Sequence, residues 1–114
     1  GSVVAYSDRD RMKMLGIKKQ TLRKNGVVSQ EAVKEMASGA LELYGTDYAI
    51  AVSGIAESSR STKDKPVGLT WIAVSNGSRT IAKRYMCGSK KEVNIHKATN
   101  FALIMLANMI SNDR

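Results

Sequence analysis

A polar loop between two apolar segments holds the residue types best suited to chemistry. The loop, Glu57 to Asp64, contains three serines, a threonine, Arg60 and Lys63, and it joins the apolar segments 48–56 and 65–74. Hydroxyls and a guanidinium in one loop can hold a phosphate through charge-assisted hydrogen bonds. A strand that delivers such a loop to its carboxyl end is how open α/β sheets build ligand sites. An ordinary surface loop between two core strands would have the same composition, so both interpretations stay open.

The dipeptide Ser53-Gly54 ends the first apolar segment. Glycine tolerates positive φ, so we expect the backbone to turn sharply there. Elsewhere the chemically capable residues are isolated. Cys87 is the single cysteine and His96 the single histidine, and they fall in separate predicted elements, so a small packed thiol is favoured over a nucleophile. No second histidine or cysteine stands at ligand spacing, and we therefore predict no metal site and no cofactor.

The order of residues around the loop resembles a known family. Ala51-Val-Ser-Gly-Ile-Ala56, eight loop residues and then Lys65-Pro-Val-Gly68 are similar to the pattern T/S-G-I-A-G-P-x-G-G-T…K-P-V-G of the CinA family C-terminal domain, which includes nicotinamide mononucleotide deamidases. The similarity continues at Val3-Val-Ala-Tyr-Ser7, Gly26-Val-Val-Ser29 and Asp47-Tyr-Ala49, and so extends along the whole chain.

The resemblance implies hydrolysis of the carboxamide of nicotinamide mononucleotide to nicotinic acid mononucleotide and ammonia. Family members use a serine nucleophile in an E-S-C-T-G-G motif, with a tyrosine and a lysine from a V-x-Y-S-N-x-x-K segment. Such a serine needs a neighbouring base, and a desolvated lysine with a lowered pKa can serve. Fixed donors must then stabilise the oxyanion of the tetrahedral intermediate.

This chain departs from the family pattern in three places. The E-S-C-T-G-G motif does not occur in the 114 residues, and Arg11 stands where the lysine belongs. Arginine stays protonated in proteins, so it can steady an anion but cannot act as the base. The family's glycine- and proline-rich loop is replaced by Glu57-Ser-Ser-Arg-Ser61, which adds side chains where backbone amides should approach the ligand.

By this resemblance, residues 1–114 form a single CinA C-terminal-like domain without the family's first helix, first strand and nucleophile motif. These parts either lie outside the 114 residues or have been lost. The resemblance assigns Tyr6 and Arg11 to the catalytic positions. The residues that it assigns to substrate binding are Ser53, Gly54, Ile55, Ala56, Arg60, Thr62, Lys65 and Lys97. For Tyr6 a strand-end tyrosine with a satisfied hydroxyl is an equal alternative, and a solvated lysine is favoured for Lys97.

The composition of the chain limits the classes of partner that it can bind. The chain is 43% hydrophobic and 25% charged, as in globular domains, and no apolar run approaches the length of a membrane span. One cysteine fits a reducing compartment, so we expect a cytoplasmic protein. The net charge of +8 raises nucleic acid as a partner, but the basic residues are diffuse and few aromatic residues are interleaved with them. We therefore favour a small anionic nucleotide over nucleic acid, and we expect no membrane partner.

Hydrophobic periodicity and turn signals predict an α/β layered domain with a mixed sheet and helices packed on it. Ser2 to Tyr6 reads as a strand, followed by a helix from Ser7 or Asp8 to Leu15, which Gly16 ends. Lys18 to Asn25 reads as a polar connection with room for one helical turn. The next helix is capped by Ser29, ends at Gly45 and packs Val33, Met36, Ala37, Ala40, Leu41 and Tyr44 on the sheet.

Three more strands and a long helix complete the prediction. The strands are Tyr48 to Ser53, Val67 to Ser75 and Arg79 to Met86, and the last is expected at an edge or with one polar face. Asn76-Gly77 predicts a type I′ hairpin between the last two. A helix from about Lys90 to Ile110 follows, with Val93, Phe101, Ala102, Met105 and Met109 toward the core. Strand 2–6 and strand 48–53 would form a right-handed parallel unit.

Two functions from different classes follow. The first is a relative of the nicotinamide-nucleotide amidohydrolases, impaired in this chain because the serine and the lysine are missing. The alternative is a catalytically silent nucleotide-binding or interaction module with the same fold. We also expect a homo-oligomer, because an unpaired strand edge invites association with another chain.

Overall fold

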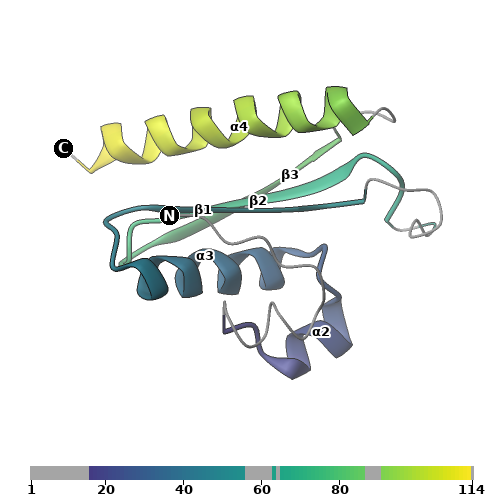
Figure 1. Cartoon of the computed structure of the whole chain (residues 1–114), viewed down its shortest axis with the longest axis horizontal. Coiled ribbons are helices and arrows are strands. Elements are labelled where there is room, and N and C mark those ends of the chain that lie inside the picture. The colour runs from purple at the N-terminus through teal and green to yellow at the C-terminus, as the bar shows by residue number, and fades with distance from the viewer. Residues whose placement is uncertain (1–15, 56–62, 64, 87–90, 114) are drawn as a thin grey trace.

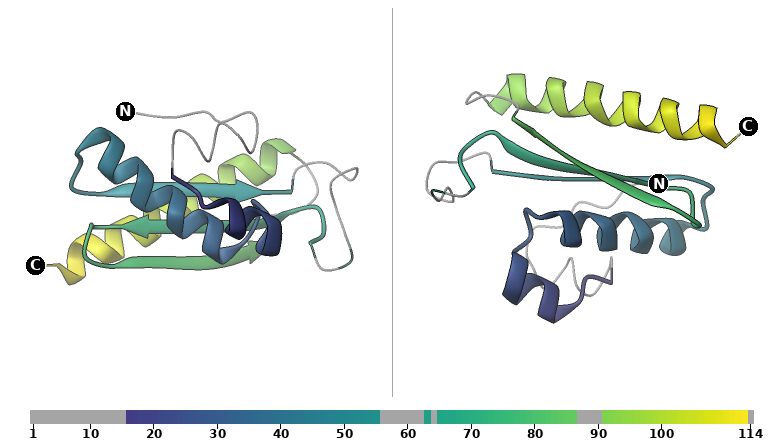
Figure 2. Two further views of the ribbon diagram at one scale, coloured as in Figure 1. Left: turned by 90° about the horizontal axis from the view of Figure 1, so that it is seen from below. Right: turned by 180° about the vertical axis from the view of Figure 1, so that it is seen from behind.

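Three layers make up the protein (Figure 1). The structure, a computed structural model, describes residues 16–55, 63, 65–86 and 91–113. Its elements are α2 (Lys19–Asn25), α3 (Gln30–Tyr44), β1 (Ala49–Gly54), β2 (Leu69–Ser75), β3 (Thr80–Met86) and α4 (Lys91–Asn112). The sheet lies between α4 on one face and α3 with α2 on the other, as the views from below and behind also show (Figure 2). The predicted α/β layered domain is confirmed.

The described sheet has the strand order β1-β2-β3, and both pairs of strands are antiparallel. Ser53 pairs with Trp71 in the first ladder, and Ile72 pairs with Lys83 in the second. The prediction that the last two strands are antiparallel neighbours, with the final one at an edge, is confirmed for the described strands. The strand expected at 2–6, which would make the sheet mixed, and the helix expected at 7–15 lie outside the described residues.

The hairpin between β2 and β3 corrects the predicted turn. Asn76 donates its N–H to the carbonyl of Arg79 at 3.1 Å, so the two central residues are Gly77 and Ser78 and not Asn76 and Gly77. Gly77 has φ 92°, whereas no described residue other than glycine has positive φ, so the turn is not of type I′. The side chain of Asn76 explains the shift, because its Oδ1 accepts from the N–H groups of Ser78 and Arg79.

α3 begins and ends where its sequence signals predict. The Oγ of Ser29 accepts from the N–H of Ala32 at 3.2 Å, and Gly45 stops the helix in the left-handed conformation (φ 60°, ψ 36°). Val33, Met36 and Ala37 are buried against Ala51 of β1 and Ala73 of β2, and Ala40 is packed against the same cluster. The prediction for Tyr44 is wrong, because this last helical residue is 39% exposed.

α2 is a seven-residue helix where a polar connection with room for one helical turn was expected. Its first turn is tied to α3 by Glu35, whose carboxylate accepts from the backbone N–H of Lys18 at 2.7 Å and from the hydroxyl of Thr21 at 2.6 Å. No local signal encodes this anchor, because residues Thr21 and Glu35 are distant in sequence. A contact with another helix therefore supports a helix whose own residues are mostly polar.

α4 covers the opposite face of the sheet. Ala102, Met105 and Met109 are buried against Ile72 and Val74 of β2, which confirms the predicted core positions. Phe101 is half-buried and stacks on Tyr85 of β3, with ring centroids 4.1 Å apart and planes 8° from parallel. Val93 lies outside the part of α4 whose side chains are described. Within the described residues, no helix has both the length and the apolar character that a membrane crossing requires.

Candidate functional site

The candidate site lies at the end of the sheet where β1 ends and β2 begins. The ladder continues one residue past β1, because the N–H of Ile55 donates to the carbonyl of Leu69 at 2.9 Å and the carbonyl of Ile55 accepts from Gly68 at 2.8 Å. Ile55 is buried with Val28 and Leu69. The backbone at the strand end is therefore held on both sides before the polar loop begins.

Gly54 is required here for a reason other than the one predicted. The residue belongs to β1 and has no positive φ, so the expectation of a sharp turn through positive φ is wrong. A Cβ at this position would stand 3.1 Å from the Oγ1 of Thr70 and 3.2 Å from the carbonyl oxygen of Leu69. The opposite strand approaches so closely that only glycine fits without a shift of backbone.

Ser53 points to the face of the sheet that α3 covers. Side chains alternate along a strand, and Ser53 therefore shares this face with Ala51 and Ile55, which are packed in the cores beside α3. Only 6% of the residue is exposed. No hydrogen bond between described residues uses its hydroxyl, although buried hydroxyls normally have a partner. Ser53 thus offers a buried donor and acceptor at the end of β1.

Lys65 joins this strand end to the junction between α2 and α3. Its Nζ donates to the carbonyl of Asn25, the last residue of α2, and a Cβ on Gly26 would stand 3.0 Å from the same nitrogen. Val27 and Val28, next along the chain, pack with Ile55. Sequence reasoning placed Lys65 in the site but missed the 25–28 segment, for which Asn25-Gly26 followed by two valines was the available signal.

The structure brings together Ser53, Gly54, Ile55 and Lys65, but not Lys97. Lys97 is exposed on α4, and the sheet separates that helix from the face occupied by Ser53. Tyr6, Arg11, Ala56, Arg60 and Thr62 lie outside the described residues, as does Cys87. The roles assigned to all these residues remain predictions. Among the described residues, no group of three histidine, cysteine or acidic side chains could hold a metal ion.

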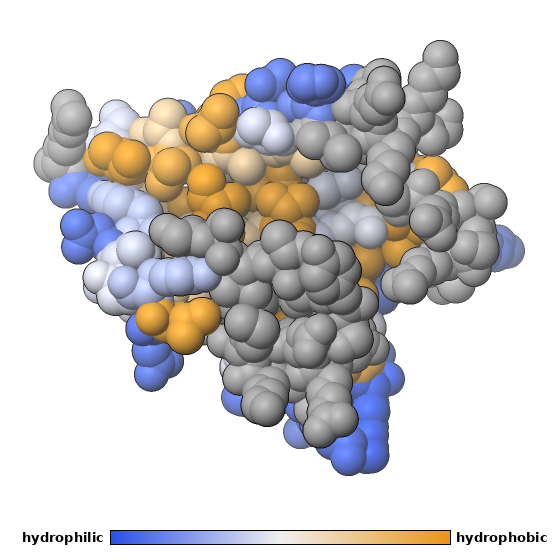
Figure 3. Space-filling model, viewed as in Figure 1, coloured by the Kyte–Doolittle hydropathy of each residue, from blue (hydrophilic) through white to orange (hydrophobic). Residues whose placement is uncertain are grey.

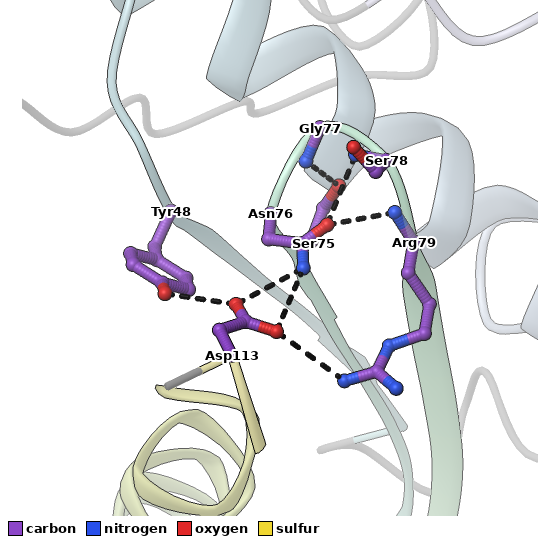
Figure 4. A network of polar contacts seen from close by, with 7 residues as sticks. All are labelled: Tyr48, Ser75, Asn76, Gly77, Ser78, Arg79 and Asp113. Atoms are coloured by element: carbon purple, nitrogen blue, oxygen red, sulfur yellow. Dashed lines mark hydrogen bonds and ion pairs between the residues drawn. The ribbon is translucent and has the colours of Figure 1, made fainter. Parts of the chain in front are cut away.

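A second polar cluster, which sequence reasoning missed, lies at the opposite end of β1 (Figure 4). The Asp113 carboxylate accepts from the hydroxyl of Tyr48 at 2.8 Å and from Nδ2 of Asn76 at 3.0 and 3.2 Å, and Arg79 lies 3.7 Å away. The hydrogen bond from Asn76, then that from Tyr48, and finally the charge of Arg79 hold the pKa of Asp113 below its ordinary value. A carboxylate engaged in this way is a poor base, so the cluster serves to tie the end of α4 to the start of β1 and to the hairpin.

Fold and site define a class: a layered α/β domain with a candidate ligand site at one end of its sheet. Comparison with known proteins specifies the family. The family model of the CinA C-terminal domain matches residues 1–110. A CinA-like protein of Endomicrobium trichonymphae is 43% identical over 106 residues, and one of Kosmotoga olearia is 39% identical over 101 residues. The chain therefore belongs to the CinA C-terminal domain family.

Solved structures agree with this assignment. The competence damage-inducible protein A of Klebsiella pneumoniae superposes with a TM-score of 0.85 at 34% identity, over 93% of this chain and 66% of that one. The competence/damage-inducible protein of Agrobacterium tumefaciens gives a TM-score of 0.79 at 28% identity, over 91% of this chain and 65% of that one. The two curated relatives are matched over 92% and 89% of this chain, but the matched region is 24% of each relative. The chain thus spans about a quarter of their length.

Proposed function

We propose that this domain is a relative of the nicotinamide-nucleotide amidohydrolases, which binds a pyridine mononucleotide where β1 meets the polar loop. One observation carries the proposal. The end of β1, Lys65 and the 25–28 segment converge at the point where the loop with Arg60 leaves the sheet. Among the described residues, this strand end carries a buried hydroxyl without a described partner, that of Ser53, next to the close approach of strands that Gly54 permits.

The chemistry of these groups suits a nucleotide. The Ser53 hydroxyl can donate to or accept from a ligand that reaches the end of β1. Lys65 and Arg60 are cations that suit the phosphate, and the hydroxyls of the 57–64 loop can add hydrogen bonds to its oxygens. Tyr6 and Arg11 would stand beside the carboxamide, as the family resemblance implies. Arg11 can stabilise a developing negative charge but cannot take a proton from a nucleophile.

Hydrolysis by this chain alone is not expected. Carboxamide hydrolysis needs an activated nucleophile and a base, and the 114 residues contain neither the family's serine motif nor its lysine. We therefore propose binding of nicotinamide mononucleotide with turnover that is impaired in this chain. The alternative is a catalytically silent nucleotide-binding or interaction module, which the presence of Arg11 at the lysine position favours.

The test combines a binding titration with an ammonia assay on the purified 114-residue chain. We expect saturable binding of nicotinamide mononucleotide and ammonia release equal to that of a heat-killed control. Arg60→Ala should weaken binding by about 1.5–3 kcal/mol, the range for a charge-assisted hydrogen bond. Lys83→Ala is the matched control, because it removes an exposed positive charge from the β3 edge, away from the strand end.

Each outcome decides a different point. Binding that Arg60→Ala leaves unchanged would refute the proposed pocket. Ammonia release above the control would refute impaired turnover, and Tyr6→Phe with Arg11→Ala would then locate the responsible groups. Equal affinity for nicotinamide mononucleotide and for a mononucleotide with another base would favour the silent nucleotide-binding module.

A further inference from the structure

A hollow lined by both polar and apolar residues lies between β3 and the C-terminal half of α4. Its volume is about 280 Å³, near the lower limit for pockets that bind small molecules. Val74, Met105 and Met109 belong to its apolar part, and all three are buried. Hydrophobic residues gather over α4 and the sheet beneath it on the face that Figure 3 shows, as expected of a packed layer. The polar residues of the hollow therefore depart from the usual packing between a helix and a sheet.

Lys83 occupies a position on β3 where an apolar side chain is expected. Side chains alternate along a strand, so Lys83 shares the face toward α4 with Ile81 and Tyr85, which pack against the core beneath that helix. The next residue, Arg84, belongs to the opposite face. Between described residues, no hydrogen bond or ion pair uses the Lys83 ammonium. A positive charge without a described counterion therefore lines the hollow.

α4 contributes polar groups to the hollow from its sheet-facing stripe. Positions 105, 108, 109 and 112 are three or four residues apart, so they lie along one face of the helix. Met105 and Met109 of this stripe are buried, whereas Asn108 and Asn112 are exposed and line the hollow, as does Ser111. In the part of the chain that the structure describes, these three polar side chains have no hydrogen-bond partner. Two amides and a hydroxyl thus remain to bind a ligand opposite Lys83.

These groups suit a small carboxylate with an apolar body. Ammonium and amide N–H groups form charge-assisted hydrogen bonds to an anionic oxygen, and one lysine balances one negative charge. Methionine side chains adapt to an irregular apolar shape, so Met105 and Met109 can contact the body of the ligand. The C-terminal end of a helix disfavours anions. We therefore expect the carboxylate beside Lys83 on β3 and the apolar body along α4.

We propose that the hollow between β3 and α4 is a binding site for a small organic carboxylate. The inference goes beyond the proposed nucleotide function and does not rest on it, because the hollow and Ser53 lie on opposite faces of the sheet. Lys83→Ala should consequently lose the carboxylate and keep the mononucleotide, so the two proposals can fail independently. The competing explanation is that Lys83 only protects an edge strand, since an inward-facing charge discourages pairing with other strands.

The test is a titration of the isotope-labelled chain with benzoate, followed by two-dimensional NMR of the backbone and asparagine amides. We expect saturable shifts of the Asn108 and Asn112 resonances. Lys83→Ala should raise the dissociation constant at least about tenfold, because a charge-assisted hydrogen bond is lost. Arg84→Ala is the matched control, since it removes the same charge from the other face of the same strand, and it should bind as the wild type does. Benzamide, which has a similar shape but no charge, should bind at least about tenfold more weakly than benzoate.

Asn108→Asp provides a second change, on α4, because its carboxylate would repel the ligand. Asn100→Asp adds the same charge outside the hollow and should bind as the wild type does. Circular dichroism checks that each variant folds. A wild type without saturable shifts overturns the proposal and leaves edge protection as the role of Lys83. Equal affinities of wild type and Lys83→Ala, or of benzoate and benzamide, overturn it as well, and so does a loss in Arg84→Ala as large as that in Lys83→Ala.

Discussion

At the scale of single residues, Gly54 shows that a sequence motif can identify an important residue without revealing why it is important. The motif correctly marks Gly54 as special, but the special property is the close approach of β2 and not a positive φ. A side chain at position 54 would meet the carbonyl of Leu69, which the ladder hydrogen bond from Ile55 holds in place. We therefore expect a side chain at position 54 to disturb the strand end that carries Ser53.

Gly54→Ala should lower the free energy of unfolding by about 1–3 kcal/mol, the cost of forcing a methyl group into a packed site. Urea denaturation of both proteins measures this difference. Gly45→Asn is the control: no atom lies within 4 Å of the added Cβ, and asparagine tolerates the left-handed conformation, so its effect should stay within roughly 0.5 kcal/mol. An alanine variant as stable as the wild type would show that the two strands can separate at no cost.

At the scale of elements, contacts between distant segments decide how helices are placed. Glu35 of α3 supports α2, and Asp113 fastens the end of α4 to the hairpin and to Tyr48. Both anchors are carboxylates that accept hydrogen bonds from two residues distant from them in sequence. Helix ends on both faces of the sheet thus depend on side chains that local patterns do not identify.

The Asp113 anchor makes part of the stability dependent on pH. The folded-state pKa of Asp113 is lowered, so its carboxylate stabilises the fold above its unfolded pKa, about 3.9. That contribution is lost as the pH falls through the folded value, because the unfolded chain binds the proton more readily. Asp113→Ala should therefore be less stable than the wild type at pH 6, and the difference should shrink as the pH falls below about 4.

Urea unfolding at a series of pH values measures this change. Tyr48→Phe removes one of the hydrogen bonds that lower the pKa, so its pH-dependent loss should be smaller and in the same direction. A difference between Asp113→Ala and wild type that stays constant from pH 6 to pH 3 would show that the Asp113 charge contributes nothing to the fold.

At the scale of the whole molecule, the excess of positive charge is spread over all layers. Arg23 and Lys24 lie on α2, Lys34 on α3, and Lys83 and Arg84 on β3. Cations that surround a molecule in this way raise the local concentration of anions without forming one binding surface. This distribution supports a small anionic ligand more than a nucleic acid.

Salt dependence distinguishes the two kinds of ligand. We expect nicotinamide mononucleotide binding to change little with salt, because few counterions are released from a single phosphate. Duplex DNA binding should be weak and fall steeply, with a slope of about −0.9 for each phosphate neutralised. Fluorescence anisotropy with a labelled duplex at two salt concentrations, beside the nucleotide titration, makes the comparison. Tight duplex binding that persists at the higher salt concentration would establish the nucleic-acid function instead.

The sequence by itself determined the features that local signals encode. Ser29 marks the start of α3 and Gly45 marks its end. Alternating patterns and apolar runs locate the three described strands, and the loop motif predicts the family. A cap, a helical period and a turn each involve residues within a few positions of one another, so a linear pattern contains the whole interaction. The grouping of Ser53, Gly54 and Lys65 at one strand end could also be predicted, because they flank a single loop.

Only the tertiary structure decided what depends on contacts between distant residues. The tertiary structure holds α2 against α3 through hydrogen bonds to Glu35. It also forms a hydrogen bond from Lys65 to the carbonyl of Asn25, 40 positions away, and one from Tyr48 to Asp113, 65 positions away. It also placed Lys97 on the other face of the sheet from Ser53. The physical reason is the same in each case. Packing brings together residues that are far apart in the sequence, and no local sequence pattern identifies which residues will meet.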